Sequence, residues 1–221
     1  MSTSTKTPPP AALHGDAEDG YPVAHQFEDI EQQFQSDTIG MWAFLITEVL
    51  FFGGLFLGYA VYRASYPEAW AEGSHHMDRV FGTINTAVLL LSSLSMALAV
   101  HAAEERKRKA TVGFLLATIG MAFVFLGIKA YEYWSHIHHH LLPGEGFEGP
   151  PAVELFFGFY FTMTGLHGLH VIIGIGVLAV ITFMTWRGRF SNHMPVEMTG
   201  LYWHFVDIVW IFLFPLFYLI A

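Results

Sequence analysis

Five stretches of this 221-residue chain are long and apolar enough to form transmembrane helices. A helix needs about 20 predominantly apolar residues to cross roughly 30 Å of hydrocarbon. The predicted spans cover residues 39–62, 81–103, 111–131, 156–186 and 198–220. No segment has the alternating ten-residue pattern of membrane β-strands. The sequence therefore predicts an all-α fold, a polytopic membrane bundle of five transmembrane helices.

The composition supports a membrane protein and excludes several kinds of partner. Charged residues make up 13% of the chain, whereas soluble domains average about 25%. The chain has no cysteine, which excludes disulfides and thiolate metal sites. Its net charge is -9. No nucleic-acid partner is expected, because phosphate binding needs a basic surface.

Residues 1–37 differ in character from the rest of the chain. They carry one lysine and seven acidic residues: Asp16, Glu18, Asp19, Glu28, Asp29, Glu31 and Asp37. The first residues lack the basic and apolar regions of a signal peptide. We predict an acidic, disordered and retained tail over residues 1–37, followed by a five-helix domain over residues 38–221.

Basic residues predict the orientation of the bundle. The loop after the second span holds residues 106–109, which are all Arg or Lys, and the loop after the fourth span holds Arg187 and Arg189. Cytoplasmic loops are enriched in Arg and Lys. Both loops are therefore predicted to lie inside, with the N-terminus inside and the C-terminus outside.

Two carboxylates, Glu48 and Asp207, lie within the predicted spans. An ionisable group in hydrocarbon is costly, so it marks either a functional site or a paired structural one. Each lies about nine residues into a span of the same direction, which places both roughly 13 Å from the inner surface. His204 shares a helix face with Asp207. We predict an inner polar network of Glu48, His204 and Asp207, with a structural or a functional role.

A second set of polar residues is predicted near the outer ends of the spans, where water relieves most of the cost of burying them. We interpret this outer cluster as structural: Asn85, Lys129, Glu132, His167 and His170. Haem or copper sites in bundles draw ligands from several helices at one depth, and di-iron sites need repeated Glu-x-x-His motifs. Neither pattern occurs within the spans. We therefore predict no catalytic residue, metal or cofactor in this chain.

Glycines recur on two of the predicted spans. Gly54 and Gly58 form a Gly-x-x-x-Gly pair, and Gly113, Gly120 and Gly127 repeat every seven residues. Such stripes allow membrane helices to approach closely. We interpret them as packing seams within the bundle.

The polar stretches also carry a family resemblance. Five motifs follow one another: Thr47–Phe52 (TEVLFF), Ile84–Thr86 (INT), Tyr131–Tyr133 (YEY), Gly165–Val171 (GLHGLHV) and Tyr202–Trp210 (YWHFVDIVW). This succession resembles subunit III of the haem–copper oxidases, chiefly the cytochrome c oxidases, from about Ser36 to Ala221. Glu48 matches the buried, carbodiimide-reactive carboxylate of that family, and His204 and Asp207 match its last-helix motif.

The resemblance implies the function. It implies an accessory, cofactor-free subunit of a proton-pumping terminal oxidase in aerobic electron transport, which stabilises subunit I and supports proton uptake. Haem and copper are then expected in partner subunits, with subunit I as the main contact beside subunit II and other respiratory subunits. Bound phospholipid and a bacterial cytoplasmic membrane are also expected.

One departure from the family leaves alternatives open. Its best-known members have seven helices, and this chain has five, with the acidic tail in place of the first pair. Five-helix forms include the quinol-oxidase branch. The alternatives are therefore a component of a quinol oxidase or a nitric oxide reductase. A small proton-coupled transporter or channel, suggested by Glu48 and Asp207 at one depth, is the alternative of another class.

Overall fold

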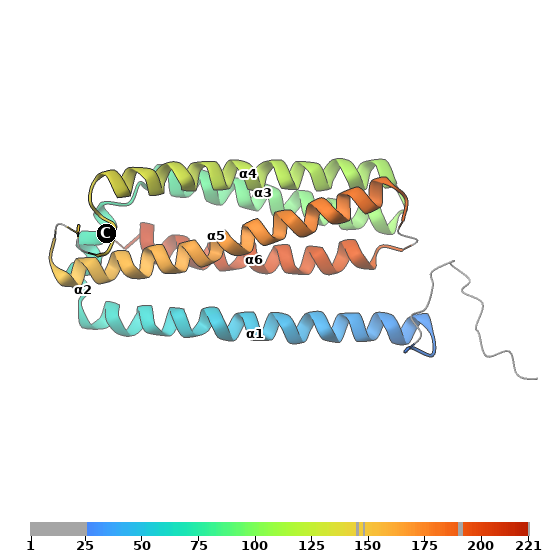
Figure 1. Ribbon diagram of the computed structural model, residues 1–221, viewed down its shortest axis with the longest axis horizontal. Coiled ribbons are helices and arrows are strands. Elements are labelled where there is room, and N and C mark those ends of the chain that lie inside the picture. Colours follow the sequence, from blue (N-terminus) through green and yellow to red (C-terminus); the bar gives the residue numbers. More distant parts are fainter. Residues whose placement is uncertain (1–25, 145, 148, 190–191, 221) are drawn as a thin grey trace, which may run out of the picture.

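The computed structural model describes residues 26–144, 146–147, 149–189 and 192–220, and all regular elements in these ranges are helices (Figure 1). They are α1 (Ile30–Ser65), α2 (Pro67–His75), α3 (Arg79–Glu104), α4 (Arg108–His138), α5 (Pro151–Trp186) and α6 (Met194–Tyr218). All except α2 are long and apolar enough to cross a membrane. In hydrocarbon a helix pairs its backbone groups internally, which explains why apolar stretches of this length are helical.

Local signals in the sequence set the helix ends. Asp29 caps α1 by accepting a hydrogen bond from the Gln32 amide at 2.7 Å, and Asp78 caps α3 by accepting one from Val80 at 2.8 Å. Such caps satisfy amides that have no partner within the helix. Proline begins α2 and α5, where its missing N–H costs nothing. Gly188 ends α5 with a φ of +69°, a conformation that favours glycine.

Helices α3, α4, α5 and α6 form a four-helix core, and α1 lies along one side of it (Figure 1). Helix α6 is central, since 56% of its most apolar window is buried, against 17% for α1. The core holds large aromatic side chains such as Trp203, Trp210 and Phe156, all 0% exposed. Apolar side chains such as Leu50 and Leu57 on α1 face outward, 71% and 67% exposed, as expected for contact with lipid.

The structure extends the predicted spans. Helix α1 begins at Ile30, so residues 30–37, which we assigned to the disordered tail, form its first two turns under the Asp29 cap. Residues 26–29 precede the helix, and residues 1–25 of that tail lie outside the described residues. Helix α4 continues seven residues beyond the predicted end at 131 and includes Tyr133 and Trp134. The sequence-based prediction missed α2, which is too short to span a membrane.

Helix α2 packs across the end of the core. Trp70 is fully buried and meets Phe156 edge to face at 5.9 Å. Gly73 faces the same Phe156 ring so closely that a side chain at this position would overlap it. This end of the bundle, which also holds the end of α6, is called the α2 end below.

The two basic loops lie together at the opposite end (Figure 1). We call it the basic end; it comprises residues 106–109 between α3 and α4 and residues 187–189 between α5 and α6. The predicted inside or outside location of this end stays a prediction.

The glycine stripe of α4 does not act as a seam within the chain. A Cβ atom built at Gly113, Gly120 or Gly127 would meet nothing within 4 Å among the described residues. Gly54 is equally open, whereas a Cβ atom built at Gly58 would lie 3.5 Å from the Phe159 ring of α5. The interpretation as intramolecular packing is therefore wrong for these four open positions, because they face outward.

Candidate functional site

Glu48 pairs with a histidine of α5. Its Oε2 lies 3.1 Å from Nε2 of His170, and the two side chains are 19% and 13% exposed. Nδ1 of His170 lies 2.7 Å from the Leu166 carbonyl oxygen, which can only accept, so this nitrogen carries a hydrogen. Nε2 is the other ring nitrogen and faces the Glu48 carboxyl oxygen. Two acceptors cannot form a hydrogen bond with each other, so this contact requires a hydrogen on Nε2 or on the carboxyl group. The Glu48–His170 pair links α1 to α5.

Two aromatic side chains position the Glu48–His170 pair. Phe52, one turn after Glu48, meets the His170 ring edge to face at 5.3 Å. Tyr202 of α6 donates a hydrogen bond to the His170 carbonyl oxygen at 3.1 Å. Three helices thus meet at His170.

His204 and Asp207 face a different helix. His204 Nδ1 lies 2.7 Å from the Ser93 hydroxyl of α3. Asp207 is 2% exposed, and neither carboxyl oxygen has a hydrogen bond of standard geometry to a described residue. Ser93 is nevertheless close enough to interact with this carboxyl group. The polar face of α6 therefore points toward α3.

The structure does not bring the three residues of the predicted inner network together. Glu48 contacts His170 of α5. His204 instead contacts Ser93 of α3, and Asp207 follows it by one turn of α6. Depth along a helix can be estimated from residue spacing, but direction around the helix depends on which neighbour packs where. The functional role of Glu48, His204 and Asp207 stays a prediction.

The predicted outer cluster divides into three parts. Lys129 donates to Glu132 Oε2 at 3.0 Å and to the hydroxyls of Tyr160 and Tyr218, both at 2.9 Å. Those hydroxyls donate in turn to Glu132 Oε1, at 2.9 Å from Tyr160 and 2.5 Å from Tyr218. This arrangement, the Lys129 cluster (Lys129, Glu132, Tyr160 and Tyr218), is a buried ion pair with two shared tyrosine donors. It ties α4 to α5 and α6.

The other members of the outer cluster lie elsewhere. His167 is fully buried between Phe125 and Trp210, with ring centroids 5.5 and 5.2 Å away. Asn85 is also fully buried, and neither side chain has a hydrogen bond to the described residues. His170 belongs to the Glu48 pair instead.

Sequence reasoning missed the two tyrosines of the Lys129 cluster. A signal was present, because Tyr160 lies seven residues before His167 and therefore on the same face of its helix. Tyr218 lies near the end of α6, far from Lys129 in sequence, and no local pattern links it to a lysine of α4.

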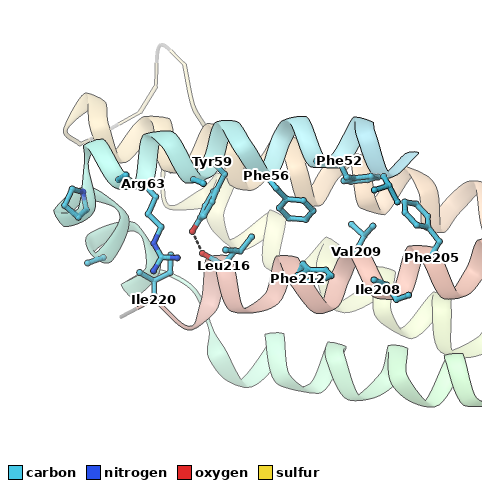
Figure 2. Close-up of a pocket in the computed structure, with 16 residues that line it drawn as sticks. Phe52, Phe56, Tyr59, Arg63, Phe205, Ile208, Val209, Phe212, Leu216 and Ile220 are labelled. Atoms are coloured by element: carbon cyan, nitrogen blue, oxygen red, sulfur yellow. Dashed lines mark hydrogen bonds between the residues drawn. The ribbon is translucent and has the colours of Figure 1, made fainter. Parts of the chain in front are cut away.

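A large apolar groove opens between α1 and α6 (Figure 2). Its volume is about 980 Å³. We call it the α1–α6 groove; its walls include Phe52, Phe56, Phe205, Phe212, Leu216 and Ile220. Tyr59 crosses it and donates a hydrogen bond to the Leu216 carbonyl oxygen. Arg63 lies near its α2 end, beside Ile220 (Figure 2), and is the only charged residue among the described residues that line the groove.

The described residues contain no group of three or more His, Asp or Glu side chains that could hold a metal ion. What the geometry shows instead is a Glu48–His170 contact, a buried ion pair between Lys129 and Glu132, and an apolar groove between α1 and α6.

The chain matches the family model for cytochrome c oxidase subunit III over residues 26–221. It is 34% identical over 204 residues to cytochrome c oxidase subunit 3 of Thermostichus vulcanus, covering 90% of this chain and 91% of the relative. It is 30% identical over 213 residues to the cytochrome bo(3) ubiquinol oxidase subunit 3 of Pseudomonas aeruginosa, covering 96% and 98%. A haem–copper oxidase subunit I+III of Aeropyrum pernix is 31% identical over 197 residues, covering 85% of this chain and 23% of the relative. With five apolar helices and this family match, the chain is a multi-pass integral membrane protein that belongs to the cytochrome c oxidase subunit III family.

Proposed function

We propose that this chain is the accessory subunit III of a proton-pumping haem–copper oxidase in a bacterial cytoplasmic membrane, with its N-terminus inside. The family match along the whole described chain carries this proposal. Haem and copper belong to partner subunits, and subunit I is the main contact. A relative in which subunits I and III form one protein supports that contact. The open glycines of α4 provide a surface on which a partner helix can pack closely.

The test is purification of the tagged full chain in mild detergent, followed by an absorbance spectrum and mass identification of the accompanying proteins. We expect haem absorbance carried by a larger subunit. The ubiquinol oxidase relative makes a quinol oxidase the second candidate, and the co-purified partners distinguish the two. A colourless preparation without partners would contradict the proposal. Proton flux through the chain alone in liposomes would then favour the transporter alternative.

We propose that the Glu48–His170 pair supports proton uptake by the oxidase. The two side chains lie 3.1 Å apart within membrane spans and are part-buried, and carboxylate and histidine side chains in spans form the proton relays of many membrane proteins. Glu48→Gln keeps a group that can hydrogen-bond His170 but removes the ionisable carboxyl. We expect fewer turnovers before inactivation, with normal retention of the subunit in the complex. Asp37→Asn, which removes a carboxylate from the start of α1, is the control.

An unchanged number of turnovers before inactivation in Glu48→Gln would restrict the pair to a structural role. Loss of the subunit from the complex in the same variant would lead to the same conclusion. Equal effects in Asp37→Asn would show that the pair is not the cause.

We propose that the α1–α6 groove binds a phospholipid, with acyl chains along its phenylalanines and the phosphate at Arg63. A basic residue near a membrane surface contributes about 1 kcal/mol to binding an anionic headgroup, so Arg63→Gln should weaken retention of such a lipid about fivefold. Lipid mass spectrometry of the purified complex measures this, with Arg79→Gln as a control at the same end of the bundle. Equal lipid loss in both variants would exclude Arg63 as the anchor.

A further inference from the structure

A second, smaller pocket lies at the basic end of the bundle, opposite Arg63. Its volume is about 370 Å³, and it is lined by Arg108, Lys109, Val112 and Trp186. It lies where α4 begins and α5 ends. Two cations and an indole ring beside an apolar floor suggest an amphipathic anionic ligand.

The two cations of this pocket are not neutralised by the carboxylates nearby. Lys107 binds Glu105 at 2.7 Å, and its hydrogen bond lowers the pKa of Glu105 below the usual range. His101 lies 3.6 Å from Glu104. Within the described part of the chain, Arg108 and Lys109 form no ion pair. The pocket therefore retains two positive charges.

The helix that supplies these cations adds to the positive potential. Arg108 and Lys109 are the first residues of α4, whose first turn contains no acidic residue and whose N-cap, Lys107, makes no side-chain hydrogen bond to the helix. The start of a helix carries partial positive charge, so cations placed there repel it. An anion bound at this point would relieve the repulsion.

Contact with the loop after α5 locates the Arg108 side chain. A Cβ atom built at Gly188 would lie 2.9 Å from Nη1 of Arg108. The guanidinium group thus packs against the backbone of the turn that follows Trp186, so it stays on the α5 side of the pocket.

The pocket continues into an apolar strip on the membrane-facing surface. Leu116 follows Val112 by one turn of α4 and is 55% exposed, and Phe183 precedes Trp186 by one turn of α5 and is 47% exposed. Trp186 itself is 61% exposed, and tryptophan is enriched at the boundary between hydrocarbon and headgroups. A lipid could place its phosphate against the basic pocket and its acyl chains against this apolar strip.

We propose that this pocket binds the phosphate of an anionic membrane phospholipid, held by Arg108, Lys109 and the start of α4, with Trp186 covering the glycerol region. Basic pockets between transmembrane helices are typical binding sites for anionic headgroups. This site is separate from the α1–α6 groove and does not depend on the oxidase role, because it requires only that the chain spans a membrane.

The experiment uses the tagged full chain, purified with whatever subunits accompany it, then delipidated and titrated with phosphatidylglycerol by native mass spectrometry. The double variant Arg108→Gln/Lys109→Gln should bind this lipid about 30-fold more weakly, because each basic residue contributes about 1 kcal/mol. The matched control is Lys107→Gln/Arg189→Gln, which removes two positive charges from the same loops but none from the pocket. This control variant should show a much smaller loss of affinity for phosphatidylglycerol.

Three outcomes would overturn the proposal. Equal weakening in both double variants would mean that diffuse charge attracts the lipid. Equal binding of phosphatidylcholine and phosphatidylglycerol by the unmodified chain would mean that the cations do not select the headgroup. Competition by inorganic phosphate at the same concentration as the lipid would identify an ion site. Conversely, Trp186→Ala should weaken phosphatidylglycerol binding without changing the binding of glycerol phosphate.

Discussion

Replacing Lys129 with methionine is expected to destabilise the fold by about 3–5 kcal/mol, the usual cost of leaving one partner of a buried ion pair alone. Methionine is similar to lysine in length but donates no hydrogen bond. Glu132, 3% exposed, would keep its two tyrosine donors and lose its cation. The change also removes the Nζ group that lies 5.3 Å from the Trp210 ring.

The control for this prediction is Lys129→Met/Glu132→Gln, which removes both charges. Replacing a whole buried ion pair with neutral groups is often close to neutral in stability. We therefore expect the double variant to recover most of the loss. Denaturant unfolding in mixed micelles, followed by tryptophan fluorescence, measures both variants. If the double variant were as unstable as the single one, the tyrosine network rather than the buried charge would be the main contribution.

Trp203→Ala is expected to cost a similar amount, about 3–5 kcal/mol, because it opens a cavity where a fully buried indole stood. Trp203 is 0% exposed and donates to the Ser92 hydroxyl at 2.9 Å. It therefore connects α6 to α3, while its ring packs against Gly174 of α5. Ser92→Ala, which removes only the hydrogen bond, should cost about 1 kcal/mol. Trp186→Ala, at an exposed indole, is the control for tryptophan fluorescence and should leave stability nearly unchanged.

The contact with Gly174 gives this prediction a stricter test. A Cβ atom at Gly174 would lie 2.8 Å from Cζ3 of Trp203, so Gly174→Ala alone should cost about 1–3 kcal/mol through overpacking. In the Trp203→Ala background the added methyl enters the cavity, and this cost should disappear. Because the residues are in contact, the two changes should be strongly non-additive. Simple additivity would show that the ring and the glycine do not share this space.

The sequence predicted contacts within one helix better than contacts between helices. Lys129 and Glu132, two members of the predicted outer cluster, form an ion pair because they are three residues apart on one helix and that spacing puts them on one face. Glu48 was assigned to Asp207 by depth, yet its partner is His170 of α5. Depth follows from the constant rise of a helix. Rotation about the helix axis depends on long-range packing, which has no local sequence signal.

The five membrane spans, their number and order, and the family can all be predicted from the amino-acid sequence alone. Each of these depends on apolar length or on motifs that can be read along one segment, and the hydrocarbon environment allows an isolated segment no other regular structure. The tertiary structure decided which face of each helix is buried. It paired Glu48 with His170, enclosed Lys129 between two tyrosines and left the glycines of α4 open. Because lipid is as apolar as the core, hydrophobicity alone cannot distinguish the inner face of such a helix from its outer face.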